Sequence, residues 1–320
     1  MPKLTKLVLG FELEQPYVER IRTTYPDVEV VVCTERAKLP EMMDGAQALI
    51  GWGLNADLMQ NHPELRWFAT GGAGVDGVLF PELIESDLIL TNNSGVHAPH
   101  MAEYLLGMML GFVRGLPELM RAQTRHEWRG RDGLTVYELG RQTLAVVGLG
   151  DIGQALAWRA NAIGMRVIGS RRHPGEAPRG VERIYAPEAL HDMLSEADHV
   201  AITLPLTDET RGLFGSAEFA VMKPTSFIYN IGRGAIIDSD ALMSALNGGQ
   251  IAGAGLDVTD PEPLPADSPL WDMEDVVITA HTSGRGPFYW ERGIELLVEN
   301  IGRFMRDEPM LNVVDKKAGY

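Results

Sequence analysis

The amino-acid sequence predicts an α/β protein with two lobes, each built on a doubly wound parallel sheet. Three observations predict this class. The 320 residues exceed what one small core needs. Short β-rich runs alternate with helical stretches in two separate series, and a glycine-rich turn at 148–153 opens the second series directly after an apolar run. We therefore expect two domains with a cleft between them.

Composition narrows the functional classes. Hydrophobic residues make up 45% and charged residues 22%, and no stretch approaches the roughly 18 apolar residues that a membrane helix needs. The formal net charge of -16, with no Lys/Arg block longer than a pair, argues against nucleic-acid binding. The single cysteine, Cys33, cannot form an internal disulfide, and the N-terminus shows no secretory signal pattern. We expect a cytoplasmic protein with neither a membrane nor a nucleic-acid partner.

The first alternating series occupies residues 1–98. Its β-rich runs are KLVLG, VEVVVC, ALIGW, RWFATG and LILTN, with helical stretches such as YVERIRTTYP between them. A long, mostly apolar segment at 97–116 then predicts a linking helix, whose Met and Leu side chains we interpret as packing residues.

The second series predicts a doubly wound nucleotide-binding domain of six strands. The strands are LAVVG, RVIGS, HVAITLP, SFIYNIG, IAGAGLDV and DVVITAH, and the helices fall near 151–163, 187–197 and 239–246. One more helix, near 288–305, is expected to return to the first lobe. The predicted domains are therefore 1–98 with 285–320 for substrate binding and 99–284 for dinucleotide binding.

The turn that opens the second series has the spacing Gly148, Gly150, Gly153. In a dinucleotide fingerprint the first glycine permits the tight turn, the second lets the backbone approach the pyrophosphate, and the third lets helix and strand pack closely. The free N–H groups at the helix N-terminus then bind the anion. Because strand, turn and helix all agree here, we expect a dinucleotide.

The end of the next strand indicates which dinucleotide. An acidic residue about 20 positions after the second glycine would bind the ribose 2′-hydroxyl of NAD. This chain has Ser170, Arg171 and Arg172 there. Two guanidinium groups and a hydroxyl suit a 2′-phosphate, so we expect NADP, with NADPH preferred over NADH. The alternative is a solvated arginine pair.

Three polar residues follow strands of the second series, where ligands bind in open α/β sheets. They are Arg233 in NIGRGAIID, Glu262 in LDVTDPEPLP and His281 in ITAHTSG. Each alone could be a surface charge, a loop residue or a buried histidine. Together they describe a proton donor held by a carboxylate, beside an arginine that can bind a substrate carboxylate and polarise a carbonyl.

The remaining histidines and the cysteine have no such setting. His97 and His100 have a spacing that could suit a metal pair, but no carboxylate or cysteine completes it, so no metal is expected. Cys33 is expected to be inert core. The other histidines are at 62, 126, 173, 191 and 199.

Six motifs in order resemble the D-isomer specific 2-hydroxyacid dehydrogenase family over almost the full length. They are GGAGVD at 71–76, VVGLGDIGQAL at 146–156, LPLTDETRGL at 204–213, NIGRGAIID at 230–238, LDVTDPEPLPADSPLW at 256–271 and HTSG at 281–284. The resemblance implies two Rossmann-like or flavodoxin-like lobes, with the nucleotide domain inserted into the substrate domain. It also implies reduction of a 2-keto acid to a D-2-hydroxy acid.

The resemblance assigns roles to residues. Arg233 would bind the substrate carboxylate and carbonyl, His281 would be the acid/base, and Glu262 would support it. Backbone N–H groups around Ala73 and Gly74 would hold the carboxylate. The implied cofactor contacts are Gly148, Gly150, Asp151, Ile152, Gly153, Ser170, Arg171, Arg172, Leu204, Pro205, Leu206, Thr210, Ile231, Gly232, Arg233, Asp257, His281, Ser283 and Gly284. Many members have Asn where this chain has His97.

Three alternatives stay open. Formate dehydrogenases share this architecture but pair the histidine with glutamine, and phosphoglycerate dehydrogenases must hold a phosphate, for which GGAGVD offers no basic cluster. A non-catalytic NAD(P)-sensing corepressor could use the same fold, although it needs no proton donor. Trp52 and the aromatic run at 288–290 could wall the substrate pocket or serve as packing. The linking helix and the stretch at 121–133 resemble the family's dimer-forming arm, which implies a homodimer.

Overall fold

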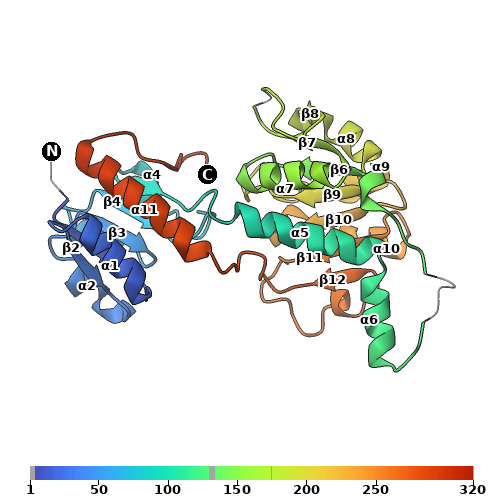
Figure 1. Cartoon of the computed structure of the whole chain (residues 1–320), viewed down its shortest axis with the longest axis horizontal. Helices are drawn as coiled ribbons and strands as arrows, with labels where there is room; N and C mark the ends of the chain where they lie inside the picture. The colour runs from blue at the N-terminus through green and yellow to red at the C-terminus, as the bar shows by residue number, and fades with distance from the viewer. Residues whose placement is uncertain (1–3, 130–133, 174, 320) are drawn as a thin grey trace. The chain divides into compact units, whose positions relative to one another are not determined.

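The computed structural model describes residues 4–129, 134–173 and 175–319. The chain divides into two compact units (Figure 1), Met1–His97 with Gly286–Tyr320, and Ala98–Arg285. The second unit is therefore an insertion in the chain of the first, as the sequence predicts.

The first unit is a five-stranded parallel sheet in the order β2-β1-β3-β4-β5. This is the flavodoxin-like strand order. The strands are β1 (Lys6–Leu9), β2 (Glu29–Val32), β3 (Ala48–Gly51), β4 (Trp67–Thr70) and β5 (Ile89–Thr91). Every residue of β3 and β4 is buried, because helices cover both faces of a doubly wound sheet.

Helices of this unit come from both ends of the chain. They are α1 (Gln15–Thr24), α2 (Leu39–Met42), α3 (Ala56–Asn61), α4 (Pro81–Glu85) and α11 (Tyr289–Arg306), with a 3-10 turn η1 (Arg36–Lys38). The apolar face of α11 places Ile294, Leu297 and Ile301 in one core with Leu7 and Ile21. The C-terminal helix thus packs on the N-terminal sheet.

The second unit is a seven-stranded parallel sheet in the order β12-β11-β10-β9-β6-β7-β8. The strands are β6 (Thr143–Val147), β7 (Arg166–Ser170), β8 (Arg183–Tyr185), β9 (His199–Ile202), β10 (Phe227–Asn230), β11 (Gly253–Leu256) and β12 (Val276–Ile278). This is the dinucleotide-binding strand order with one added strand. The prediction of six strands was wrong, because the edge strand β8 has only two apolar residues, Ile184 and Tyr185, and so lacks the longer apolar run that marks the other strands.

The helices of the second unit cover both sheet faces. They are α5 (Ala98–Val113), α6 (Leu116–Thr124), α7 (Asp151–Ala162), α8 (Leu190–Glu196), α9 (Ser216–Val221) and α10 (Ser239–Asn247). Four 3-10 turns accompany them, η2 (Leu139–Arg141), η3 (Pro187–Ala189), η4 (Gly234–Ile236) and η5 (Pro269–Trp271). Buried side chains from these helices and the strands form two apolar clusters, one on each side of the sheet.

The linking helix predicted at 97–116 is α5, but it ends three residues earlier than predicted, at Val113, and a separate helix, α6, begins at Leu116. Gly115 between them has a φ of +66°, a left-handed conformation that glycine adopts without strain. The apolar pattern continues across this break, which hid it from periodicity alone. Among the described residues, no helix has both the length and the apolar character needed to cross a membrane.

Candidate active site

The turn between β6 and α7 has the geometry that its three glycines predict. Gly148 has a φ of +107°, and a Cβ on Gly153 would lie 2.1 Å from the Gly148 carbonyl oxygen. Gly150 is the N-cap of α7 without a side-chain cap, and a Cβ there would meet nothing within 4 Å. The first N–H groups of α7 therefore point from an uncapped helix end toward open space, as an anion site requires.

The arginine pair lies beside this turn. The backbone oxygen of Ser170, at the end of β7, accepts hydrogen bonds from the N–H groups of Gly148 (3.1 Å) and Leu149 (2.9 Å). The Nε atom of Arg171 is buried and has no hydrogen-bond partner, while its Nη2 donates to the Glu176 oxygen at 2.8 Å. Arg172 forms an ion pair with the exposed carboxylate of Glu209. The Arg171 guanidinium thus has an N–H without an acceptor, whereas the Arg172 guanidinium is paired with a carboxylate.

The loop after β9 is closed by its own hydrogen bonds. Thr210 Oγ1 donates to the Pro205 oxygen at 2.7 Å and accepts from the Thr207 N–H at 2.8 Å. The side chain of Leu204 packs against Gly148, where an added Cβ would come within 2.9 Å of it. Leu206 is half-buried and packs on the core. The predicted residues of this loop thus border the glycine turn.

Arg233 is positioned by the end of β10. The Asn230 side chain accepts a hydrogen bond from the Gly232 N–H at 3.0 Å and donates one to the Arg233 oxygen at 2.9 Å. A Cβ on Gly234 would lie 2.0 Å from the Thr259 backbone, so only glycine allows these loops to pack so closely. The Arg233 side chain is half-buried, with Nη1 donating to the Gly232 oxygen at 2.9 Å.

Glu262 and His281 meet directly. His281 Nδ1 lies 2.9 Å from Glu262 Oε2, and Glu262 Oε1 accepts a hydrogen bond from the Thr259 N–H at 3.1 Å. The two side chains are 50% and 39% exposed, so the imidazole is held on one side and open to solvent on the other. Since Nδ1 faces a carboxylate, it carries the hydrogen, and Nε2 is the nitrogen left for chemistry.

The three predicted residues follow neighbouring strands. Arg233 comes after β10, Glu262 lies in the loop that leaves β11, and His281 comes after β12. Because all strands are parallel, their carboxyl ends lie at one edge of the sheet. The structure thus brings Glu262 and His281 into contact, and Gly234 joins the Arg233 loop to the loop of Glu262 through Thr259.

Asp257 organises the turn that carries His281. Its buried carboxylate accepts hydrogen bonds from Thr279 Oγ1 (2.9 Å), the Thr282 N–H (2.8 Å) and the Ser283 N–H (3.0 Å), and Tyr104 OH donates to it at 3.3 Å. Sequence reasoning placed Asp257 among the cofactor contacts and did not find this role or Tyr104, Thr279 and Thr282. No local spacing signals these contacts, because they join residues up to 153 positions apart.

The backbone of this turn is unusual. Ala280 and His281 have φ values of +48° and +56°, in the left-handed region that non-glycine residues seldom occupy. The His281 N–H donates to the Asp257 oxygen at 2.5 Å. Such conformations cluster at functional sites because the surrounding structure must hold them. Next to them, Ser283 Oγ is buried and has no hydrogen-bond partner. The Gly284 oxygen lies 3.0 Å from His100 Nε2.

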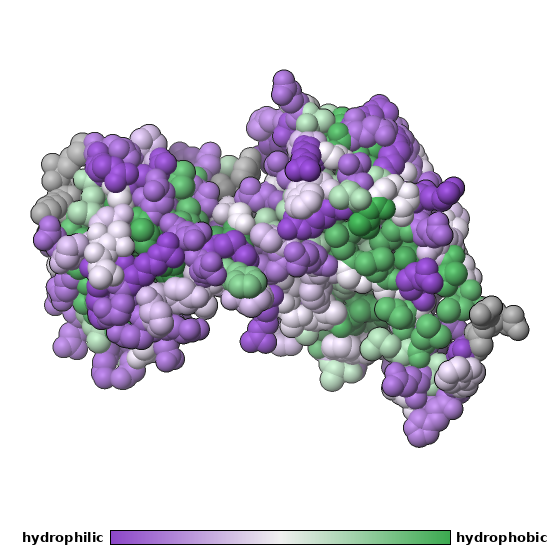
Figure 2. Space-filling model, viewed as in Figure 1, coloured by the Kyte–Doolittle hydropathy of each residue, from purple (hydrophilic) through white to green (hydrophobic). Residues whose placement is uncertain are grey.

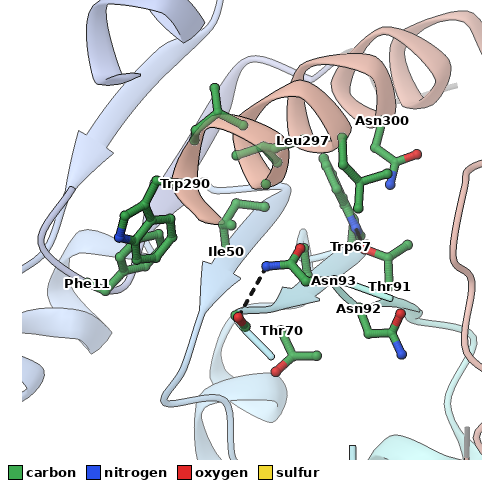
Figure 3. Close-up of a pocket in the computed structure, with 15 residues that line it drawn as sticks. Phe11, Ile50, Trp67, Thr70, Thr91, Asn92, Asn93, Trp290, Leu297 and Asn300 are labelled. Carbon is green, nitrogen blue, oxygen red and sulfur yellow. Dashed lines mark hydrogen bonds between the residues drawn. The ribbon is translucent and has the colours of Figure 1, made fainter. Parts of the chain in front are cut away.

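The predicted residues Ala73, Gly74 and Trp52 belong to the first unit. The Trp52 ring contacts Phe11 edge-on at 5.6 Å, and a Cβ on Gly71 would lie 2.5 Å from its ring atoms. Figure 3 shows Phe11 and Trp290 at a pocket that Gly71 also lines. The two rings are stacked, with their centroids 5.1 Å apart. Trp52 is 46% exposed.

The remaining histidines lie outside this constellation. His199 is fully buried, with Tyr229 OH at 3.0 Å and Gln142 Oε1 at 2.9 Å, and burial lowers its pKa to about 4. His191 meets Glu218 at 2.8 Å. Within the described ranges, no group of three or more His, Cys, Asp or Glu is placed to hold a metal. Cys33 is buried in the core of the first unit.

Comparison with known proteins decides the family. Residues 106–283 match the family model described as D-isomer specific 2-hydroxyacid dehydrogenase, NAD binding domain. The chain is 33% identical over 281 residues to a glyoxylate reductase of Korarchaeum cryptofilum, covering 86% of this chain and 83% of the relative. The chain belongs to the D-isomer specific 2-hydroxyacid dehydrogenase family. It is accordingly an oxidoreductase.

Two further relatives of this dehydrogenase agree. A glyoxylate/hydroxypyruvate reductase B of Pectobacterium atrosepticum is 39% identical over 243 residues, which cover 74% of this chain and 75% of the relative. The structure of an NADPH-dependent glyoxylate/hydroxypyruvate reductase of Sinorhizobium meliloti, in complex with NADP and sulfate, matches with a TM-score of 0.84. Its sequence is 30% identical, with coverage of 99% of this chain and 100% of the other.

Proposed function

We propose that this dehydrogenase reduces a small 2-keto acid with NADPH, giving the D-2-hydroxy acid. The observation that carries the proposal is the 2.9 Å contact between His281 Nδ1 and Glu262 Oε2 at the carboxyl edge of a dinucleotide-binding sheet. Relatives named glyoxylate and glyoxylate/hydroxypyruvate reductases make glyoxylate and hydroxypyruvate the first substrates to test. They favour this activity over a phosphoglycerate or formate dehydrogenase and over a non-catalytic corepressor.

The proton transfer is assigned to His281. Glu262 accepts the Nδ1 hydrogen and thereby fixes the tautomer and the orientation of the ring. His281 Nε2 then gives its proton to the keto oxygen as the carbonyl carbon gains a hydride. NADPH, when bound, would supply that hydride. Solvent returns the proton to the exposed imidazole after product release.

Substrate binding is assigned to a guanidinium and to backbone amides. Arg233 would bind the carboxylate in two-pronged fashion and polarise the keto group, since a guanidinium offers two parallel N–H donors to a carboxylate. In the first unit, the N–H groups of Ala73 and Gly74 are proposed to bind a substrate carboxylate, with Trp52 as a further substrate-binding residue. The first unit is thus proposed as the substrate-binding domain, and the second as the dinucleotide-binding domain.

The dinucleotide fits the residues of the second unit. The uncapped N-terminus of α7, with Gly150 open above it, suits the pyrophosphate. The two buried side-chain atoms that lack partners, among the described residues, are Arg171 Nε and Ser283 Oγ. Both belong to residues that the sequence predicts as cofactor contacts. A 2′-phosphate would satisfy Arg171, which supports NADP over NAD.

A pair of substitutions tests the function. His281→Ala should lower kcat for glyoxylate at least 1,000-fold while the Kd for NADPH, followed by its fluorescence, stays within about twofold. Glu262→Gln should lower kcat less, about 10- to 100-fold, because the imidazole remains and only its support weakens. An Ala variant that turns over at the wild-type rate, or a wild-type chain inactive on every small keto acid, would reject the assignment.

We also propose a cytoplasmic homodimer formed through α5 and α6. Figure 2 shows apolar residues gathered on the second unit over the region where Figure 1 places these helices. Leu110, Leu116 and Met120 are exposed there, and Trp128 in the following segment is 98% exposed. Exposed apolar patches of this kind mark interaction sites. The arm predicted at 121–133 runs past residue 129 into positions outside the described residues.

A further inference from the structure

The loop after β4 has its carbonyl groups tied down by residues from two other segments. The Gly71 oxygen accepts from Asn93 Nδ2 at 3.1 Å and from Tyr289 OH. The Gly72 oxygen accepts from the Asn93 N–H at 2.9 Å, and the Ala73 oxygen accepts from Asn92 Nδ2 at 2.8 Å. Three consecutive carbonyl groups therefore each accept a hydrogen bond.

Most N–H groups of the same loop, unlike its carbonyl groups, have no hydrogen-bond partner among the described residues. The Gly71 N–H donates to the Gly51 oxygen at 3.2 Å, but the N–H groups of Gly72, Ala73 and Gly74 have no acceptor in the described part of the chain. Gly74 is exposed, and Gly72 and Ala73 are half-buried. Unpaired successive N–H groups of this kind form a concave site for an anion, provided that their carbonyls stay turned away.

Tyr289 and Asn93 hold this arrangement together. Tyr289 is the first residue of α11, and its hydroxyl donates to the Gly71 oxygen while accepting from Asn93 Nδ2 at 2.9 Å. Burial raises the pKa of the Tyr289 phenol, so it stays protonated and able to donate. The phenol ring packs against the His97 ring with centroids 4.7 Å apart, which fixes its direction. Figure 3 shows Asn93 pointing from its strand end along the dashed bond to this loop.

We propose that Tyr289 and Asn93 are positioning residues for the substrate carboxylate. By holding the Gly71 oxygen between them, they keep the N–H groups of Gly72, Ala73 and Gly74 directed outward before substrate arrives. This inference rests on the proposed function, since it takes the loop as the carboxylate site. Their proposed effect on catalysis passes through the orientation of the loop.

Tyr289→Phe is the direct test, because it removes the hydroxyl and keeps the ring. The KM for glyoxylate should rise about tenfold, equivalent to about 1.4 kcal/mol, within the range that hydrogen bonds contribute. The Ki of oxalate, a carboxylate that cannot be reduced, should rise in parallel. The kcat and the Kd for NADPH should stay within about twofold. Asn93→Ala should shift KM and Ki in the same direction, since it removes the amide that donates to both the Gly71 oxygen and the phenol oxygen.

Tyr25→Phe is the matched control. Like Tyr289, Tyr25 lies in the first unit and donates its hydroxyl hydrogen to a backbone oxygen. The acceptor is the Val298 oxygen in α11, at 2.7 Å. It should destabilise the fold without changing either substrate constant. Equal KM and Ki for Tyr289→Phe and wild type, or an equal loss in both tyrosine variants, would overturn the inference. Calorimetry measures the Kd of oxalate without any turnover, so the positioning role can be tested even if the protein reduces no keto acid. Failure of the proposed activity and failure of the positioning role can therefore be distinguished.

Discussion

Individual side chains in the second unit differ in what they would have to give up to bind a ligand. Arg171 Nε is buried and unpaired, so a phosphate oxygen would be a net gain for it. Arg172 is paired with Glu209, and a phosphate must replace that carboxylate. The Ser170 oxygen is occupied by the glycine turn. At the residue scale, Arg171 should therefore carry more of the preference for a 2′-phosphate than Arg172.

Arg171→Ala tests this difference. Loss of a charge-assisted hydrogen bond of about 1.5–3 kcal/mol should raise the KM for NADPH about 10- to 100-fold and leave the KM for NADH within about twofold. Arg172→Ala should raise the KM for NADPH less. Arg141→Ala, which removes an exposed guanidinium paired with Glu138 in the same unit, should change neither constant. Steady-state kinetics with both dinucleotides would show it, and identical NADPH constants for Arg171→Ala and wild type would refute it.

The proposed catalytic residues could be named from sequence because each follows a strand in a recognisable motif. The 2.9 Å pairing of Glu262 with His281 was expected on chemical grounds, since a proton donor needs a carboxylate to hold it. The buried carboxylate of Asp257 and its partner Tyr104 were not, because a hydrogen bond across 153 positions leaves no local pattern. The left-handed φ of His281 was equally invisible, since no glycine marks that turn.

At the scale of elements, strong periodicity made the long helices and buried strands predictable. The errors fall at β8, which has only two apolar residues, and at Gly115, where the apolar run of α5 passes into α6. Because the chain breaks at Gly115, a second amphipathic helix, α6, begins there. Its exposed side includes Leu116 and Met120, so the apolar surface extends beyond α5.

If α5 and α6 form the dimer interface, charge on α6 should disrupt it. Leu116→Glu combined with Met120→Glu would place two carboxylates in an apolar contact, which costs several kcal/mol unless they are paired. Light scattering should give twice the chain mass of 35.1 kDa for wild type and the single mass for the variant. Val313→Glu, at another exposed apolar residue, should remain dimeric. A wild-type monomer, or a charged variant that stays dimeric, would contradict the proposal.

The stability of the whole molecule is coupled to one buried histidine. His199 is fully buried between Tyr229 and Gln142, and burial lowers its pKa to about 4 from an ordinary 6.5. The folded state therefore favours the neutral ring. Below pH 6.5 the unfolded chain binds a proton that the folded chain does not, so the free energy of unfolding falls as pH falls toward 4. Well above pH 6.5 the ring is neutral in both the folded and the unfolded chain, so His199 no longer makes the free energy of unfolding depend on pH.

Between pH 7 and pH 5 the loss attributable to His199 should be about 2 kcal/mol, from 1.36 kcal/mol for each pKa unit. This window separates it from carboxylates such as Glu196 and Glu218, whose lowered pKa values affect stability below their ordinary 4.5. Urea unfolding of wild type and His199→Gln at pH 5, 6 and 7 measures it. The variant should be less stable at pH 7 but have a flatter pH dependence, while His126→Gln, at an exposed position, should follow wild type. Parallel pH curves for wild type and His199→Gln would mean that His199 does not link protonation to folding.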